Sequence, residues 1–314
     1  MSVLALGCSN DVELVRGDAA MPLAGPAWQR VASPTAVDLH DVFVAGRADV
    51  WAVGDAGTVL HLDDRGWQRV PLQTTARLNS VYAVSGREVW VVGEDPAGEP
   101  VVFRGDGQRW VSVRPMTRGR ARFRGLWGGA AELWLVGGLS DSSEPALWRY
   151  DGAQWRPEML PQPLRNPEFF ALRGNAAGAL WAVGGAGLSM RSTASGWSLG
   201  PPPPRDTVFS GGLCVNADGV PFVATAQGAV LTLVDAVWRS DSLAASAPLG
   251  GLYCDPSGEV IGVGPGGRVA TFDGVRWREV QLGGPDLEAV SARDRGEVWA
   301  VGARGTLVVR RVAP

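Results

Sequence analysis

The 314-residue sequence contains no lysine, only two histidines, three cysteines and three tyrosines, and no long apolar segment. All 29 basic residues are therefore arginine, and 32 acidic residues bring the net charge to −3. A chain of this charge has no overall reason to bind nucleic acid. No apolar run approaches the roughly 18–20 residues of a membrane helix, and no window of about 15 residues keeps a helical period. Membrane spans and long helices are therefore not expected.

The sequence also lacks the common catalytic motifs. It has no G-x-S-x-G, no P-loop, no H-E-x-x-H and no C-x-x-C, which are the short signatures of several enzyme and redox classes. His40 and His61 fall in expected strands of the same repeat, where a hydrogen-bonded or exposed side chain is a better interpretation than a metal ligand. We therefore expect no enzyme activity, no cofactor and no metal.

What the sequence has instead is glycine, with 43 residues, and an apolar motif that recurs about every 40 residues. The first copy is DVWAVGDAGTVLHLDDRGW (49–67) and the last is EVWAVGARGTLVVRRV (297–312). The position of Trp51 is occupied in the later copies by Trp90, Trp134, Trp181, Phe222, Ile261 and Trp299. Another short apolar strand precedes each copy, so every repeat holds four strands, as a propeller blade does.

Seven such repeats arranged face to face around an axis would bury both faces of every sheet. This arrangement explains why the VWAVG strands are apolar at nearly every position instead of alternating. The tryptophans are then interpreted as core residues that fill the wedges between blades. The sequence therefore predicts an all-β fold, a seven-bladed β-propeller of four-stranded blades, with residues 25–314 forming a single domain.

The seventh copy ends before its fourth strand. AWQRV at 27–31 matches the fourth-strand segments GWQRV at 66–70 and RWREV at 276–280. We therefore expect this N-terminal strand to pair with the last three strands of the chain. Closing the ring in this way would remove the two exposed edges of an open array.

The pattern D/E-V-W-A-V-G-x-x-G-x-x-L, followed by D-G-x-x-W, resembles the Asp-box propellers, also called bacterial neuraminidase repeat propellers. It is most similar to the branch that includes the photosystem II assembly factor and the WD-YVTN-like repeat propellers of bacterial lipoproteins. YDGAQW (150–155) and FDGVRW (272–277) keep the Asp, the Gly and the aromatic residue of the box. The resemblance covers residues 25–312 and implies a structural turn whose Asp side chain bonds backbone groups.

The N-terminal segment MSVLALGCSND places Ala5-Leu6-Gly7 before Cys8 and resembles a bacterial lipobox. The preceding stretch is shorter than the roughly 15–30 residues of a secretory signal and has no basic residue. Either the start codon has been assigned too far downstream, or this is an ordinary N-terminal tail with a chance cysteine. We favour the first interpretation: residues 1–24 are a signal remnant and tether, and Cys8 is lipidated in the outer membrane of a Gram-negative bacterium. If Met1 is the true start, the protein is cytoplasmic.

Cys214 and Cys254 lie on the first strands of adjacent repeats. In the repeat register Cys214 aligns with Tyr253, so Cys254 is offset by one residue and faces the opposite side of its strand. Facing side chains on neighbouring blades need this opposite parity, so a disulfide is plausible and would require an oxidising compartment. Two small buried hydrophobic residues are the alternative.

Function in propellers is expected on the face that carries the blade-to-blade connectors and the loops between second and third strands. The long connectors 114–124, 157–169 and 200–209, and the long loops 93–100 and 137–145, all fall on this face. The candidate ligand contacts there are Arg114, Arg118, Arg120, Arg122, Arg124, Glu94, Asp95, Asp141, Glu144 and Arg165. If extended, the arginine run would project as a comb for carboxylates or phosphates. Pairing of these arginines with acidic neighbours, or solvation, is the alternative to which we give more weight.

Three classes of function remain. The first, which we favour, is a binding or scaffold propeller of the cell envelope that recognises a protein or peptide, with an acidic partner suited to the arginines. The second is a carbohydrate-binding propeller, and the third is a divergent glycosidase or lyase. We expect a monomer that binds no nucleic acid and touches the membrane only through a lipid anchor.

Overall fold

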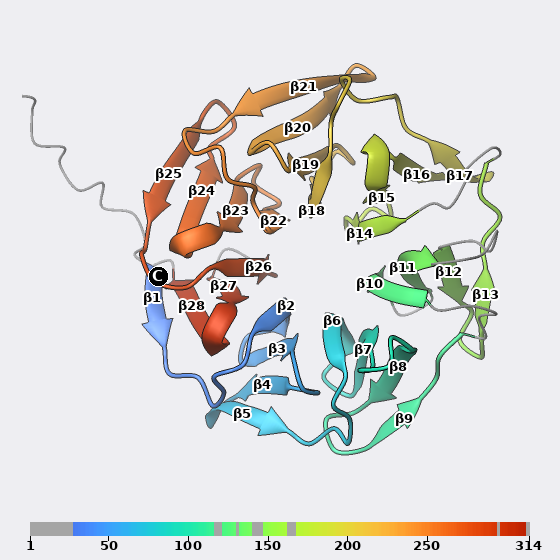
Figure 1. Ribbon diagram of the computed structural model, residues 1–314, viewed down its shortest axis with the longest axis vertical. Coiled ribbons are helices and arrows are strands. Elements are labelled where there is room, and N and C mark those ends of the chain that lie inside the picture. Colours follow the sequence, from blue (N-terminus) through green and yellow to red (C-terminus); the bar gives the residue numbers. More distant parts are fainter. Residues whose placement is uncertain are drawn as a thin grey trace, which may run out of the picture.

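The computed structural model describes residues 28–115, 121–129, 132–139, 147–161, 168–293 and 296–311. Seven four-stranded antiparallel sheets stand around a central axis as the blades of a propeller (Figure 1). The predicted fold class and blade number are confirmed. Within the described ranges, no helix has the length and apolarity that a membrane span requires. Residues 1–24, expected to form the leader and tether, lie outside the described part.

Each blade runs from an inner first strand to an outer fourth strand. Blade one holds β2 (Leu39–Gly46), β3 (Asp49–Gly54), β4 (Val59–Asp63) and β5 (Gly66–Val70). Blade two holds β6 (Arg77–Ser85), β7 (Glu88–Glu94), β8 (Pro100–Gly105) and β9 (Trp110–Ser112). Blade three holds β10 (Ala121–Gly128), β11 (Leu133–Leu139), β12 (Leu147–Tyr150) and β13 (Trp155–Pro157). Blade four holds β14 (Phe169–Gly174), β15 (Leu180–Gly184), β16 (Ser189–Thr193) and β17 (Gly196–Leu199).

The remaining blades follow the same order. Blade five holds β18 (Phe209–Val215), β19 (Pro221–Thr225), β20 (Ala229–Val234) and β21 (Val237–Ser242). Blade six holds β22 (Gly251–Cys254), β23 (Val260–Gly264), β24 (Arg268–Phe272) and β25 (Trp277–Gln281). Blade seven holds β26 (Leu287–Ala292), β27 (Glu297–Gly302) and β28 (Thr306–Arg311), with β1 (Trp28–Val31) as its outer strand. Short 3-10 turns, η1 (Gly185–Gly187), η2 (Pro265–Gly267) and η3 (Ala303–Gly305), join second and third strands.

The N-terminal strand closes the ring as predicted. β1 pairs antiparallel with β28, in a register that runs from Trp28 opposite Arg310 to Val31 opposite Leu307. Arg310 donates two hydrogen bonds to the carboxylate of Glu259, at 2.9 and 2.6 Å, and its guanidinium lies 6.0 Å from the ring centre of Trp28. The first and last strands of the described chain are therefore held in one sheet.

Among the described residues, the core consists of seven apolar clusters, each formed between two neighbouring blades. Outer-strand tryptophans pack edge-on against second-strand tryptophans of the preceding blade, as Trp67 does against Trp299, with ring centres 5.2 Å apart. Trp155 makes the same contact with Trp90, at 5.7 Å. The interpretation of the repeated tryptophans as wedge fillers is confirmed.

The acidic residue that opens the motif has a structural role that was not predicted. The indole N–H of Trp51 donates to Asp49 at 2.8 Å. In blade seven, Trp299 donates in the same way to Glu297 at 3.2 Å. A buried indole needs an acceptor for its N–H, and a carboxylate two residues earlier on the same face of the strand supplies it. The recurring D/E-x-W spacing is the signal for this pair.

The glycine that ends the motif is required by a close approach of two strands. A Cβ atom added to Gly54 would lie 2.0 Å from the carbonyl oxygen of Asp38. Gly93 and Gly302 show the same approach, at 1.9 and 2.0 Å from the equivalent carbonyl oxygens. Any larger residue would force the second strand away from the start of the first strand.

The two ends of the propeller carry different connections. The connector face carries the blade-to-blade connectors and the loops between second and third strands. The turn face carries the turns between first and second strands and between third and fourth strands. On the turn face, Asp151 Oδ1 accepts the backbone N–H groups of Ala153 and Gln154 at 3.0 and 2.9 Å, so the Asp of YDGAQW stabilises its turn as expected.

Candidate functional site

The axis of the propeller is hollow at both faces. A cavity of about 410 Å3 opens on the connector face, and a larger cavity of about 520 Å3 opens on the turn face. Asp41 and Arg173 line both, and an ion pair of 3.5 Å between them separates the two cavities. Blades one and four, which supply these residues, lie across the axis from each other (Figure 1).

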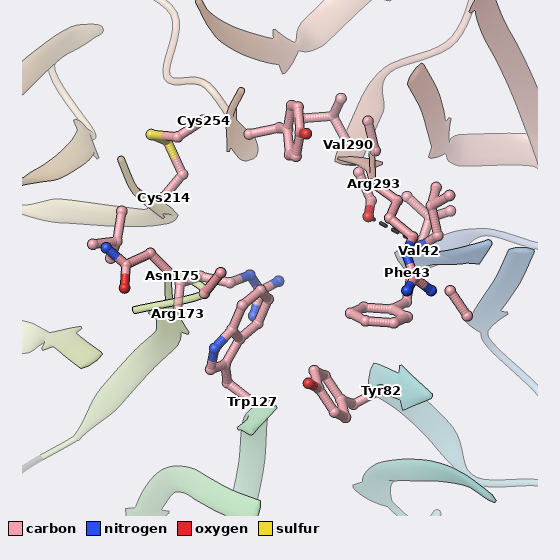
Figure 2. A pocket seen from close by; sticks show the side chains of 18 of the residues that line it. Val42, Phe43, Tyr82, Trp127, Arg173, Asn175, Cys214, Cys254, Val290 and Arg293 are labelled. Atoms are coloured by element: carbon pink, nitrogen blue, oxygen red, sulfur yellow. Dashed lines mark hydrogen bonds between the residues drawn. A yellow bond between two sulfur atoms is a disulfide. The ribbon is translucent and has the colours of Figure 1, made fainter. Parts of the chain in front are cut away.

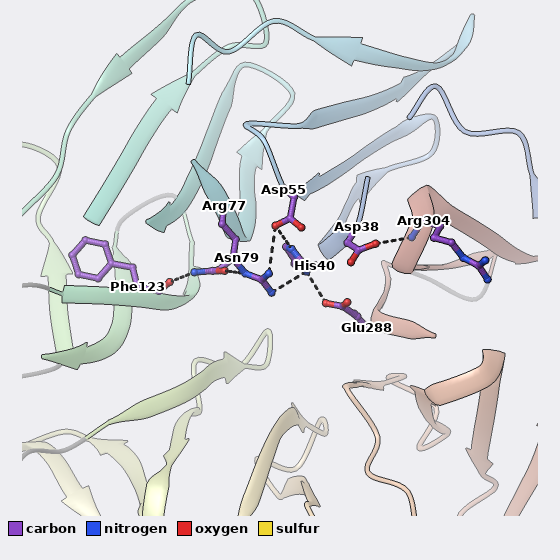
Figure 3. A network of polar contacts seen from close by, with 8 residues as sticks. All are labelled: Asp38, His40, Asp55, Arg77, Asn79, Phe123, Glu288 and Arg304. Atoms are coloured by element: carbon purple, nitrogen blue, oxygen red, sulfur yellow. Dashed lines mark hydrogen bonds and ion pairs between the residues drawn. The ribbon is translucent and has the colours of Figure 1, made fainter. Parts of the chain in front are cut away.

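The connector-face cavity is polar and contains a network around His40 (Figure 3). His40 Nδ1 lies 2.6 Å from Glu288 Oε2, and Nε2 lies 2.8 Å from Asp55 Oδ1. Arg77 lies 3.4 Å from the same Asp55 oxygen and donates to Asn79 Oδ1 at 3.2 Å. The network therefore connects blades seven, one and two across their inner strands.

The charge state of His40 follows from these contacts. Burial of the imidazole disfavours its charged form, but the hydrogen bonds to Glu288 and Asp55 outweigh burial and raise the pKa of His40 above 6.5. Both ring nitrogens are already engaged by carboxylates, so the imidazole is arranged to join three blades rather than to accept a proton from a substrate. In the described ranges, no group of three or more His, Cys, Asp or Glu side chains is placed to hold a metal ion.

We expect the contribution of His40 to stability to depend on pH. Because its pKa is raised in the folded state, this contribution is fully present below about pH 6.5 and is lost as the pH rises through the folded pKa. Urea unfolding of the native chain and of His40→Asn should therefore differ more at about pH 5.5 than at about pH 8.5. An equal difference at both pH values, or a larger one at high pH, would contradict this network.

Three of the predicted site residues meet in a groove on the connector face. Glu94, Asp95 and Arg122 line a hollow of about 410 Å3 together with Asp55 and Arg77. Arg122 Nε lies 3.7 Å from Glu94 Oε2. Asp95 Oδ1 accepts the backbone N–H groups of residues 97 and 99, both at 2.9 Å, and so holds its own loop. We call this hollow the charged groove.

Two arginines at the end of the run, Arg122 and Arg124, are described, and they do not project together as a comb. Arg122 and Arg124 belong to β10 rather than to a connector, and a register shift between Phe123 and Gly125 interrupts their alternation. Arg122 therefore pairs with Glu94 in blade two, while Arg124 lies 3.6 Å from Glu168 beside blade four. Arg114 is exposed in the connector after β9. The other predicted site residues lie outside the described ranges: Cys8, Arg118, Arg120, Asp141, Glu144 and Arg165.

The turn-face cavity, which we call the axial cavity, was not predicted. In each blade, one residue of the inner strand lies directly opposite the second-strand residue that corresponds to Trp51. These seven inner-strand positions are therefore equivalent. They are Phe43, Tyr82, Trp127, Arg173, Cys214, Tyr253 and Ser291. All seven line the axial cavity, several of them labelled in Figure 2. A comparison of this one position in all seven repeats of the sequence would have predicted the residues of the axial cavity.

Cys214 and Cys254 form a disulfide with a Cα–Cα distance of 5.5 Å. The bond joins the inner strands of blades five and six, and it lies in the wall of the axial cavity (Figure 2). Cys214 pairs opposite Phe222, whereas Tyr253 occupies the equivalent position in blade six. The bonded cysteines are therefore offset by one residue in the repeat register, which is the parity that facing side chains need.

Comparison with solved structures shows the fold. YCF48 bound to D1 peptide is 19% identical, with a TM-score of 0.70 over 91% of this chain and 97% of that chain. YCF48 from Cyanidioschyzon merolae is 17% identical, with a TM-score of 0.72 over 91% and 99%. Virginiamycin B lyase from Staphylococcus aureus, with quinupristin, is 13% identical, with a TM-score of 0.75 over 91% and 99%. No family model and no curated protein matches the sequence. At these identities the likeness establishes a seven-bladed propeller, a fold that serves both binding proteins and enzymes.

Proposed function

We propose that this chain is a non-catalytic binding or scaffold propeller of the bacterial cell envelope, which recognises a protein or peptide on its connector face. The observation that supports this most is the charged groove, where Glu94, Asp95, Arg122, Asp55 and Arg77 line one open hollow. Side chains of both signs at the mouth of a rigid scaffold suit the recognition of a polar segment by charge-assisted hydrogen bonds. YCF48, which has the same fold, has a structure with a bound peptide.

The polar groups of this face favour binding over catalysis. A general base must reach a substrate proton, but the imidazole of His40 is held between Glu288 and Asp55. A lectin built on a propeller is expected to repeat one polar pocket in each blade. The seven equivalent inner positions instead hold six different residue types. Protein or peptide recognition is therefore the function that the geometry supports best.

The location in the envelope is part of the same proposal. A disulfide between Cys214 and Cys254 is supported by its geometry, and such bonds persist mainly in oxidising compartments. Lipidation at Cys8 would hold the propeller at the membrane surface by an acyl anchor. The alternative location is the cytoplasm.

Site-specific photo-crosslinking in the native organism tests the function. A photoreactive residue in place of Pro96, an exposed residue of the charged groove, should yield one discrete adduct in the envelope fraction. Adding Arg122→Glu should reduce that adduct several-fold, because it reverses a charge in the groove, and the adduct should also decrease with added salt. Arg239→Glu is the matched charge reversal on the exposed surface of the outer strand β21.

Two results would overturn the proposed function. One is an adduct from Pro96 that Arg122→Glu leaves unchanged. The other is the same adduct from a photoreactive residue at Ser195, an exposed turn residue of blade four away from the groove. Melting temperatures of all variants should stay close to that of the native chain, because exposed charges contribute little to stability.

A further inference from the structure

The axial cavity has the size and closure of a small-molecule site. Its volume of about 520 Å3 falls within the roughly 300–1,000 Å3 that such sites occupy. One end opens between the turns of the turn face, and the Arg173–Asp41 ion pair lies at the other end, where the two cavities meet.

One wall of the cavity is aromatic (Figure 2). The ring centre of Tyr82 lies 4.6 Å from that of Phe43 and 5.6 Å from that of Trp127. The Tyr82 hydroxyl donates to the carbonyl of Gly128, and burial raises the pKa of Tyr82, so this ring stays neutral. The disulfide lines another part of the wall. These surfaces favour a flat apolar guest that stacks or packs edge-on against them.

The cavity also contains two guanidinium groups, those of Arg173 and Arg293 (Figure 2). Arg173 lies 5.8 Å above the ring of Trp127 and donates to the Leu172 carbonyl at 3.0 Å. Its bond to Asp41 is long, at 3.5 Å. A guanidinium has five N–H donors, and within the described part of the chain the Arg173 guanidinium makes these two hydrogen bonds.

Asp41 engages only one N–H of the Arg173 guanidinium, through the long bond. Its carboxylate is buried and accepts shorter hydrogen bonds from Ser80 Oγ at 2.7 Å and from the backbone N–H groups of Val42 and Val81 at 3.0 and 3.1 Å. With Arg293 at the mouth, the lining has two cations and one carboxylate. An apolar body with one negative group would complement it, because a carboxylate can accept two parallel bonds from a guanidinium.

We propose that the axial cavity is a binding site for a small aromatic carboxylate. The ring lies against Phe43, Tyr82 and Trp127, and the carboxylate accepts hydrogen bonds from Arg173, with Arg293 at the mouth. This site is separate from the charged groove and does not depend on a protein partner.

Calorimetric titration of the full chain with three probes tests the ligand class. The probes are benzoate, phenylacetate and indole-3-acetate. We expect at least one to bind, its neutral amide to bind about tenfold more weakly or worse, and the corresponding amine to give no heat of binding. Equal affinity for acid and amide, or no binding of any of the three at millimolar concentration, would overturn the proposal.

Variants then locate the bound probe. Arg173→Gln should weaken binding of the acid about tenfold or more while leaving the weak binding of the amide unchanged. Ser291→Phe should abolish binding of both, because it places at the equivalent position of blade seven the ring that blade one carries as Phe43. Arg304→Gln, an exposed arginine of the connector face, is the matched control and should bind like the native chain. Unchanged binding in folded Arg173→Gln or Ser291→Phe would place the probe elsewhere and refute the site.

Discussion

A chain that lacks residues 1–31, and therefore β1, should lose more than about 3 kcal/mol of unfolding free energy and aggregate. The reason is that β1 is the outer strand of blade seven and pairs with β28 along its whole length. Without it, β28 becomes an exposed edge with unpaired N–H and C=O groups, and the Glu259-bound Arg310 loses its contact with Trp28. Urea unfolding and size-exclusion chromatography measure the two effects.

A chain that lacks only residues 1–27 is the matched control, because it keeps β1 complete. It should unfold at the same urea concentration as the full chain and elute as a monomer. If both truncated chains were as stable as the full chain, the pairing of β1 with β28 would contribute nothing and the closure of the ring would be refuted.

Gly54→Ala should destabilise the protein by about 3 kcal/mol or more. The added methyl group would lie 2.0 Å from the carbonyl oxygen of Asp38. Because this oxygen belongs to the backbone, the clash can be relieved only if a strand moves out of the sheet. Gly302→Ala should have a similar effect, since its Cβ would lie 2.0 Å from the carbonyl oxygen of Asp286. Thermal and urea unfolding of the purified variants measure the loss.

Gly46→Ala is the control for this substitution, because it lies in the same pair of strands. Its added Cβ would lie 3.8 Å from Asp49 Cβ, an ordinary contact, so we expect a change within about 1 kcal/mol. If Gly54→Ala reduced the unfolding free energy as little as Gly46→Ala, the close approach of two strands would not explain the glycine of the motif.

The two openings of the axis are chemically distinct, and this separates the two proposals. The connector-face cavity is bounded by His40, Arg77 and Glu288, whereas the axial cavity is bounded by aromatic rings and the disulfide. The Arg173–Asp41 pair lies between them. A small aromatic carboxylate and a protein partner should therefore bind without competing, and the failure of either experiment leaves the other informative.

The sequence alone determined the architecture, because a propeller is a local pattern repeated. A four-stranded unit with Trp51 or its equivalents in every copy contains the information for one blade, and burial of both faces then requires a ring. The seventh copy of the repeat lacks its outer strand, and the segment 27–31 matches the outer strands of other copies. Together these two observations predicted the closure of the ring. Cys214 and Cys254 are offset by one residue in the repeat register. Because side chains alternate between the two faces of a strand, this offset lets the two cysteines face each other from neighbouring blades.

The two proposed binding surfaces depend on the tertiary structure. Arg173 meets Asp41 across the axis, 132 positions away in the sequence. The repeat places both residues on inner strands, but it does not show that their side chains meet. The arginine run looked like a comb on the assumption of regular alternation, but the register shift at Phe123 and Gly125 turned Arg122 and Arg124 toward different blades. A repeat specifies what its copies share, whereas a binding site on the axis consists of the residues in which they differ, and these are brought together only when the ring closes.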